Sequence, residues 1–202
     1  MKKLLCLCTV FLSLTLTGCV SFIPAGPIGD PAQKAQSTQP RAAMVEDVVI
    51  TDSKVNDARR KTLSAQFTEQ LARRVERGEY FEEVISFPAT LGEQDVALKF
   101  TFTSLKAKRT PHPAYFPGAL LTLTVWIWVN GPIYVDKYDV AGDLQIVDAH
   151  GKLLSSSEQA VKLNQNTGLW DNDYFNTSLG ADQLNQLVEQ LLQDATHKLA
   201  NP

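Results

Sequence analysis

The amino terminus is the feature that most restricts what this chain can fold into. A short basic segment, Met-Lys-Lys, opens the chain, and an uncharged, leucine-rich stretch follows it from Leu4 to Leu16. This order and length are typical of the basic and hydrophobic regions of a secretory signal peptide. A membrane-spanning helix needs about 20 apolar residues, and prolines and glycines interrupt the run from Pro24 onward. We therefore favour a removed signal peptide over the alternative, an uncleaved membrane anchor.

The residues at the end of this stretch resemble the lipobox of bacterial lipoproteins. Leu16 is followed by two small residues, Thr17 and Gly18, directly before Cys19. The resemblance implies cleavage between Gly18 and Cys19, a diacylglyceryl group on the Cys19 sulfur and an acyl group on the new amino terminus. The acyl chains on Cys19 would then bind the membrane. By resemblance to the sorting of Gram-negative lipoproteins, Val20 in place of an aspartate implies the outer membrane, in its periplasmic leaflet.

Composition and motif content argue against several classes of function. The chain has 19 Lys and Arg against 22 Asp and Glu, which predicts no basic surface for phosphates and no nucleic-acid partner. Its three histidines and three cysteines lack the paired spacing of metal-binding motifs, so we expect no metal and no cofactor. The sequence also lacks a nucleophile elbow, a phosphate-binding loop and a dinucleotide fingerprint. We therefore predict that the protein is not an enzyme.

The signal peptide, residues 1–18, is followed by two further regions. Residues 19–44 are rich in Pro, Gly, Gln and Ala, and this composition predicts the lipidated cysteine followed by a flexible linker. Such a coil would hold the domain ~25–30 Å from the membrane. Residues 45–202 show no internal repeat and have the size of one periplasmic domain.

Hydrophobic periodicity predicts an α+β fold for this domain: a single, mainly antiparallel sheet with one amphipathic helix after the first strand and a C-terminal helix packed on the sheet. The expected strands are 48–50, 83–87, 94–107, 132–148 and 152–163, and the expected helices are 57–77 and 181–199. A hairpin turn is expected at 148–151. The element order resembles the small periplasmic α/β modules of assembly lipoproteins such as the CsgG and TolB amino-terminal types, without a shared motif.

The segment from Gly118 to Val129 has no charged residue and is too short to span a bilayer as a helix. Its alternation favours a strand that is apolar on both faces, and the more ordinary interpretation is a buried central strand. The alternative is an exposed element that dips into the bilayer or binds a partner. The candidate contact residues are then Leu121, Leu123, Trp126, Ile127 and Trp128. The segment's position resembles that of an apolar stretch in uncharacterised proteobacterial envelope lipoproteins.

A second candidate site lies in the polar and aromatic segment before the last helix. Asp171 and Asp173 could offer oxygens to calcium, and Trp170 and Tyr174 could stack on a sugar ring. The segment lacks the glycine and terminal glutamate of a calcium-binding EF-hand loop. Turn and capping chemistry, in which Asx side chains bond the local backbone, is the favoured interpretation.

Together these features predict an outer-membrane-anchored lipoprotein of unknown biochemical activity. Its domain would be a non-enzymatic interaction or assembly module of the cell envelope, with an envelope protein or the bilayer as partner. The alternative is a periplasmic domain that binds a saccharide or an envelope fragment.

Overall fold

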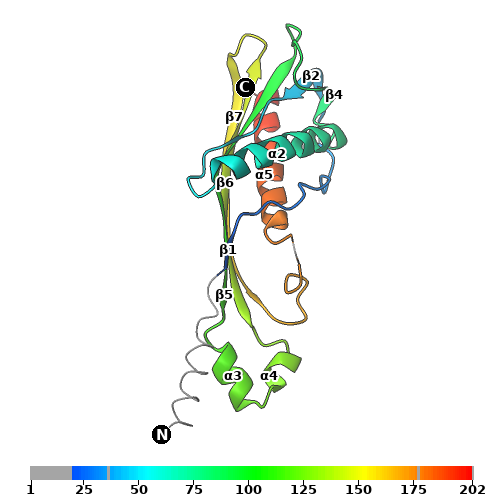
Figure 1. The fold of residues 1–202 in the computed structure, drawn as a ribbon. Coiled ribbons are helices and arrows are strands. Elements are labelled where there is room, and N and C mark those ends of the chain that lie inside the picture. Colours follow the sequence, from blue (N-terminus) through cyan, green and yellow to red (C-terminus); the bar gives the residue numbers. More distant parts are fainter. Residues whose placement is uncertain (1–19, 36, 177, 202) are drawn as a thin grey trace. The chain divides into compact units, whose positions relative to one another are not determined.

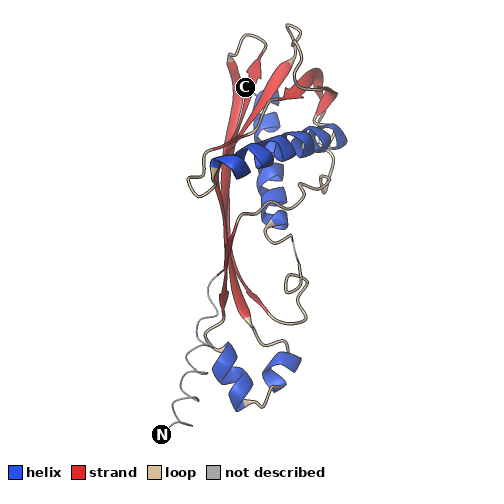
Figure 2. Cartoon of the chain, viewed as in Figure 1, coloured by secondary structure: helices blue, strands red, loops and turns tan. Residues whose placement is uncertain are grey.

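The computed structural model describes residues 20–35, 37–176 and 178–201. This part of the chain contains seven strands and four helices (Figures 1 and 2). The strands are β1 (Val20–Phe22), β2 (Gln39–Val45), β3 (Val49–Ile50), β4 (Phe81–Ile85), β5 (Val96–Pro111), β6 (Tyr134–Asp148) and β7 (Leu153–Thr167). The helices are α2 (Asp57–Arg77), α3 (Tyr115–Leu121), α4 (Val125–Trp128) and α5 (Ala181–Ala200).

All seven strands belong to one sheet, in the order β4-β2-β5-β6-β7, with β1 and β3 also paired to β5. The sheet is mixed, because β2 is parallel to β4 and β5, and β3 is parallel to β5. The expected turn joins β6 to β7, and Gly151 takes a φ of 80° there, which glycine adopts without strain. The α+β class and the C-terminal helix are confirmed.

Within this domain the described residues form two compact units. The small unit contains residues 20–22, 107–137 and 163–176, and the core unit contains residues 23–106, 138–162 and 178–201. The strands β5, β6 and β7 contribute residues to both units. The hydrophobic core described next lies in the core unit, whereas both candidate sites expected from the sequence lie in the small unit.

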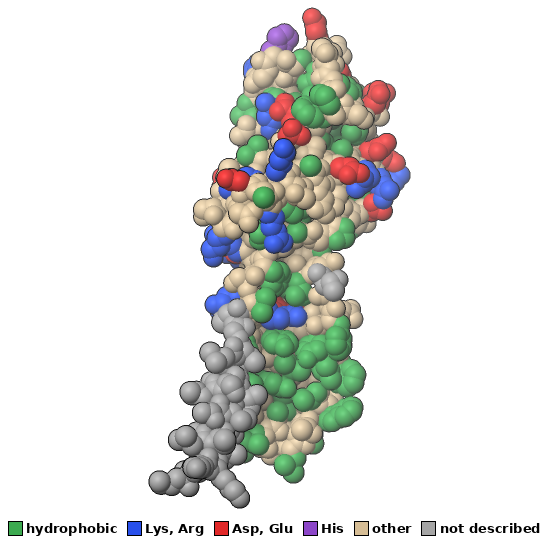
Figure 3. All heavy atoms as spheres, viewed as in Figure 1, with side chains coloured by type: hydrophobic (Ala, Val, Ile, Leu, Met, Phe, Trp, Pro, Cys, Tyr) green, Lys and Arg blue, Asp and Glu red, His purple; other side chains and the backbone are tan. Residues whose placement is uncertain are grey.

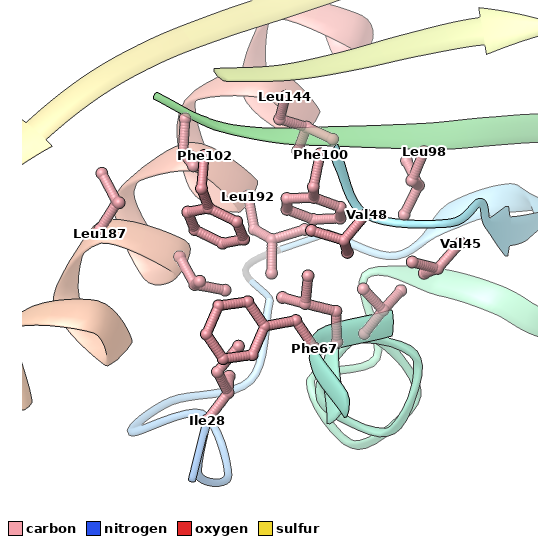
Figure 4. Close-up of a cluster of buried hydrophobic side chains, with 14 of the residues drawn as sticks. Ile28, Val45, Val48, Phe67, Leu98, Phe100, Phe102, Leu144, Leu187 and Leu192 are labelled. Atoms are coloured by element: carbon pink, nitrogen blue, oxygen red, sulfur yellow. The ribbon is translucent and has the colours of Figure 1, made fainter. Parts of the chain in front are cut away.

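The two long helices bury the apolar stripes that the sequence predicts. On α2, Phe67 is fully buried and its ring meets that of Phe102 edge-on, with the ring centroids 5.3 Å apart. Leucines of α5 and aliphatic residues of β5 and β6 complete the same cluster (Figure 4). The stripe at every fourth residue of α2 is buried throughout: Leu63, Phe67, Leu71 and Val75. This burial explains why both helices form where periodicity places them.

The start of α2 depends on a side-chain cap. Asn56 has an extended backbone, and its Oδ1 accepts a hydrogen bond of 2.9 Å from the backbone N–H of Arg59. We expect Asn56→Ala to lower the free energy of unfolding by about 1 kcal/mol. The N–H of Arg59 lies in the first turn, where the helix offers no carbonyl acceptor, and the substitution removes the side-chain acceptor that replaces it. Urea denaturation measures the change. Gln66→Ala, at an exposed position of the same helix, is the control, and an equal loss in both variants would contradict the prediction.

The segment predicted as a flexible linker is part of the fold instead. Ile28 is only 6% exposed and belongs to the hydrophobic cluster, and its N–H donates to Gln70 of α2 at 2.8 Å. Arg74 of α2 donates to the carbonyl of Gly29 at 2.8 Å. Residues 39–45 form β2, between β4 and β5. The composition typical of a linker therefore belongs here to a segment that packs on α2 and supplies a strand.

Candidate membrane- or partner-binding surface

The apolar segment of the small unit forms two short helices, so the prediction of a strand is wrong. α3 ends at Leu121, and Leu123 and Thr124 have φ values of 48° and 73° before α4 begins at Val125. The Thr122 hydroxyl accepts the N–H of Trp126 at 2.9 Å and donates to the carbonyl of Gly118 at 2.7 Å. These hydrogen bonds join residues of the same segment, so its backbone does not depend on pairing with a neighbouring strand.

Most apolar side chains of this segment face solvent, so the prediction of a buried core strand is also wrong. Leu120, Leu121 and Leu123 are 76%, 81% and 83% exposed. Nine large hydrophobic side chains of residues 107–137 and 163–176 are more than half exposed, and we call them the apolar surface: Phe116, Leu120, Leu121, Leu123, Val125, Trp128, Val129, Trp170 and Phe175. Figure 3 shows hydrophobic side chains gathered at α3 and α4. No charged residue occurs in the sequence between Arg109 and Asp136.

The indole ring of Trp126 packs against Gly118 and Gly131. Its indole N–H donates to the carbonyl of Pro132 at 3.3 Å. A side chain on Gly118 or Gly131 would overlap the indole ring, so both glycines are needed for this close packing. Of the five candidate contact residues, Trp126 and Ile127 are half-buried and support the two helices, whereas Leu121, Leu123 and Trp128 are exposed.

The second candidate site joins this surface through Asn130. The side chain of Asn130 accepts the N–H of Trp170 and donates to Asp171, each at 2.9 Å. The rings of Trp128 and Trp170 lie 6.0 Å apart between centroids. The structure thus brings together two segments that the sequence analysis treated separately.

The polar atoms of the second segment are engaged in local hydrogen bonds. The other carboxylate oxygen of Asp171 accepts the N–H of Gly168 at 2.6 Å, and Asp173 accepts hydrogen bonds from Gln165 and Asn176. Tyr174 packs between Tyr134 and Phe175, with centroid distances of 5.8 and 4.7 Å. Among the residues that the structure describes, no group of three or more His, Cys, Asp or Glu side chains is placed to hold a metal ion.

A buried ion pair fixes this segment to the strands, and the sequence analysis did not predict it. Asp136 of β6 is 0% exposed, and its two carboxylate oxygens accept hydrogen bonds of 2.7 and 2.6 Å from Arg109 of β5. Thr167 of β7 also donates to Asp136 at 2.7 Å. Arg109 donates further to the backbone carbonyl of Asp173 at 2.9 Å. Its guanidinium carbon lies 5.1 Å from the centroid of the Tyr134 ring. Arg109 therefore links the sheet to the segment that carries Trp170.

The amino-terminal strand places the start of the described chain in the small unit. β1 pairs antiparallel with β5, so that Val20 lies opposite Arg109 and Phe22 opposite Ala107. The predicted cleavage and lipidation residues, Gly18 and Cys19, lie outside the described residues. In the sequence, Cys19 directly precedes Val20, the first residue of β1.

No helix in the described part of the chain is both long and apolar enough to cross a membrane. No protein-family model matches the sequence, and no curated protein matches it.

Several solved structures match most of this chain, each at low sequence identity and with a TM-score below 0.5. A putative neuraminyllactose-binding hemagglutinin homolog from Helicobacter pylori is 13% identical, with a TM-score of 0.45 over 86% of this chain and 91% of its own. A Xanthomonas campestris protein of the DUF330 family is 7% identical, with a TM-score of 0.47 over 86% and 96%. A lipoprotein from Neisseria meningitidis is 13% identical, with a TM-score of 0.34 over 81% and 100%. Similarity at this level assigns neither a family nor an activity.

Proposed function

We propose that this protein is an outer-membrane-anchored lipoprotein that acts as a non-enzymatic interaction or assembly module of the cell envelope. The observation that carries the proposal is the apolar surface, which is exposed and has seven of its nine residues in a stretch of sequence without a charge. Soluble monomers rarely leave large contiguous apolar patches in water, and such patches mark sites that bind a protein or a membrane. The lipobox-like residues before Val20 support the proposal that the protein is anchored in the membrane.

The anchor is tested by mass spectrometry of the mature amino terminus, from membranes separated on a density gradient. We expect a triacylated Cys19 in the outer-membrane fraction. Cys19→Ser is the control, because it lacks the sulfur that the lipid would modify, and it should lose the acyl mass. An intact Met1, or an unmodified soluble chain, would contradict the proposed anchoring.

The contact function is tested with a photo-crosslinking amino acid at position 121, introduced in the full-length protein in living cells. Leu121 is among the most exposed residues of the apolar surface, so we expect crosslinks to an envelope component, either protein or lipid. Leu153 provides the matched control. It is an exposed leucine beside the hairpin turn, where Asp148 and Lys152 make the surface polar. Equal crosslinking at the two positions would show that the apolar surface has no special role.

A further inference from the structure

We infer that the apolar surface inserts into the same lipid leaflet that holds the acyl chains of Cys19. The inference rests on the proposed lipid anchor and names the bilayer as the partner of the surface. Three observations on the small unit carry it: the position of β1, the internal hydrogen bonding of the segment between α3 and α4, and the balance of charge.

The first observation concerns where the anchored end of the chain lies. Because β1 runs antiparallel to β5, its first residue, Val20, lies beside Arg109, close to the end of β5 at Pro111. The helix α3 begins at Tyr115, four residues after Pro111. Val20 is also the residue bonded to Cys19. The lipid anchor and the apolar surface are therefore attached at the same end of the small unit, without a flexible spacer between Cys19 and the first strand.

The second observation is that the backbone N–H groups of the exposed segment are bonded within the protein. In lipid, every backbone N–H must find its acceptor inside the protein. Each N–H from Thr122 to Ile127 donates to an oxygen between Gly118 and Thr124, five of them to backbone carbonyls and that of Trp126 to the Thr122 hydroxyl. A surface built in this way can exchange water for acyl chains without leaving these donors unpaired.

The third observation is charge. The described residues of the small unit carry three basic and three acidic side chains: Lys108, Arg109, Lys137, Asp136, Asp171 and Asp173. Electrostatic attraction therefore favours neither an anionic nor a cationic partner, and the stretch from Thr110 to Val135 lacks the charged side chains that protein partners use for orientation. Acyl chains need only apolar contact. The exposed indoles of Trp128 and Trp170 are the side chains that proteins place at the membrane interface.

The test uses the mature lipidated protein with Leu121→Cys, labelled with an environment-sensitive fluorophore and reconstituted in phosphatidylcholine vesicles. Cys6 and Cys8 lie in the removed segment and Cys19 carries lipid, so the new cysteine is the free thiol of this protein. We expect a blue-shifted emission and several-fold stronger quenching by brominated lipid than for the same label at Leu153→Cys. Because insertion does not depend on charge, the difference should persist at high salt.

Native tryptophan fluorescence provides a second measurement that needs no substitution. Trp128 and Trp170 are exposed, so brominated lipid should quench the unlabelled lipidated protein. A label at position 121 that remains in water would overturn the inference, and so would crosslinking at that position to a protein or to a second copy in place of lipid. These results would leave the lipid anchor intact, whereas a missing acyl group on Cys19 would refute the anchor itself.

Discussion

Asp136→Ala is expected to lower the free energy of unfolding by ~3–5 kcal/mol, because it removes the carboxylate that balances the buried charge of Arg109. The side chain of Arg109 is only 13% exposed, so the lost carboxylate faces a largely buried guanidinium. The loss should also release the segment from Gly168 to Asn176, which Arg109 holds through the backbone carbonyls of Asp173 and Tyr174. Chemical denaturation measures the first effect, and amide hydrogen exchange across this segment measures the second.

Two variants separate the buried charge from general damage. Lys162→Ala removes the partner of Asp139 from a pair 4.0 Å apart on the surface, where Lys162 is 74% exposed, and should change the stability by less than about 1 kcal/mol. The double variant Arg109→Met with Asp136→Leu removes both buried charges and should recover part of the loss. If Asp136→Ala and Lys162→Ala proved equally mild, Asp136 would not be the anchor of the network.

In the core unit, Arg74→Ala is expected to cost a similar ~3–5 kcal/mol. Arg74 is 3% exposed and donates to Glu189 of α5 at 2.6 Å and to Asn185 at 3.0 Å. Tyr80 donates to the same Glu189 at 3.1 Å. Burial and the neighbouring Glu189 carboxylate raise the pKa of Tyr80 far above its usual value, so the phenol stays protonated and remains a donor. Removing the guanidinium leaves Glu189 with neutral donors.

The adjacent arginine gives a matched control on the same helix. Arg73 pairs with Glu69 one turn earlier, and both side chains are largely exposed. Arg73→Ala should therefore cost only a few tenths of a kcal/mol. The two variants are compared by thermal and urea unfolding, and equal losses would show that burial of Arg74 adds nothing. Hydrogen exchange around Ile28 and Gly29 should rise only in Arg74→Ala, because Arg74 binds the Gly29 carbonyl.

The long elements could be predicted from the sequence because their patterns are repeated many times. α2 and α5 each carry an apolar stripe over several turns, and β5, β6 and β7 alternate over long stretches. Burial of one face then decides both the element and its orientation. The sequence also gave a sound reason to single out Trp128 and Trp170, although it did not reveal that they lie side by side.

The segment between Gly118 and Val129 could not be assigned from its pattern. A short run in which nearly every residue is apolar fits a strand and a buried helix equally well. What decides its structure is the close packing of Trp126 on two glycines and the hydrogen bonds of the Thr122 hydroxyl. These are interactions of single residues, so they cannot be predicted from the periodicity of the sequence.

The linker prediction failed for a related reason. Prolines and glycines between residues 24 and 31 lower the tendency to form regular structure, but they do not prevent Ile28 from filling a space against α2. The buried ion pair, in contrast, left a signal in the sequence. Asp136 stands between Tyr134 and Tyr138 on the inward face of its strand, and a charge at such a position requires a partner.

The direct connection of Cys19 to β1 has a consequence for the strength of membrane binding. Under the proposed lipidation of Cys19, contact of α3 and α4 with the leaflet that holds the acyl chains would be an intramolecular event. Short connections of this kind give effective concentrations on the order of millimolar or higher. Weak intrinsic affinity of the apolar surface for lipid is then enough to keep it inserted. If the surface dissociates from the leaflet, it rebinds to the same leaflet. Partners of this protein would meet the small unit at the membrane surface and not at a distance set by a tether.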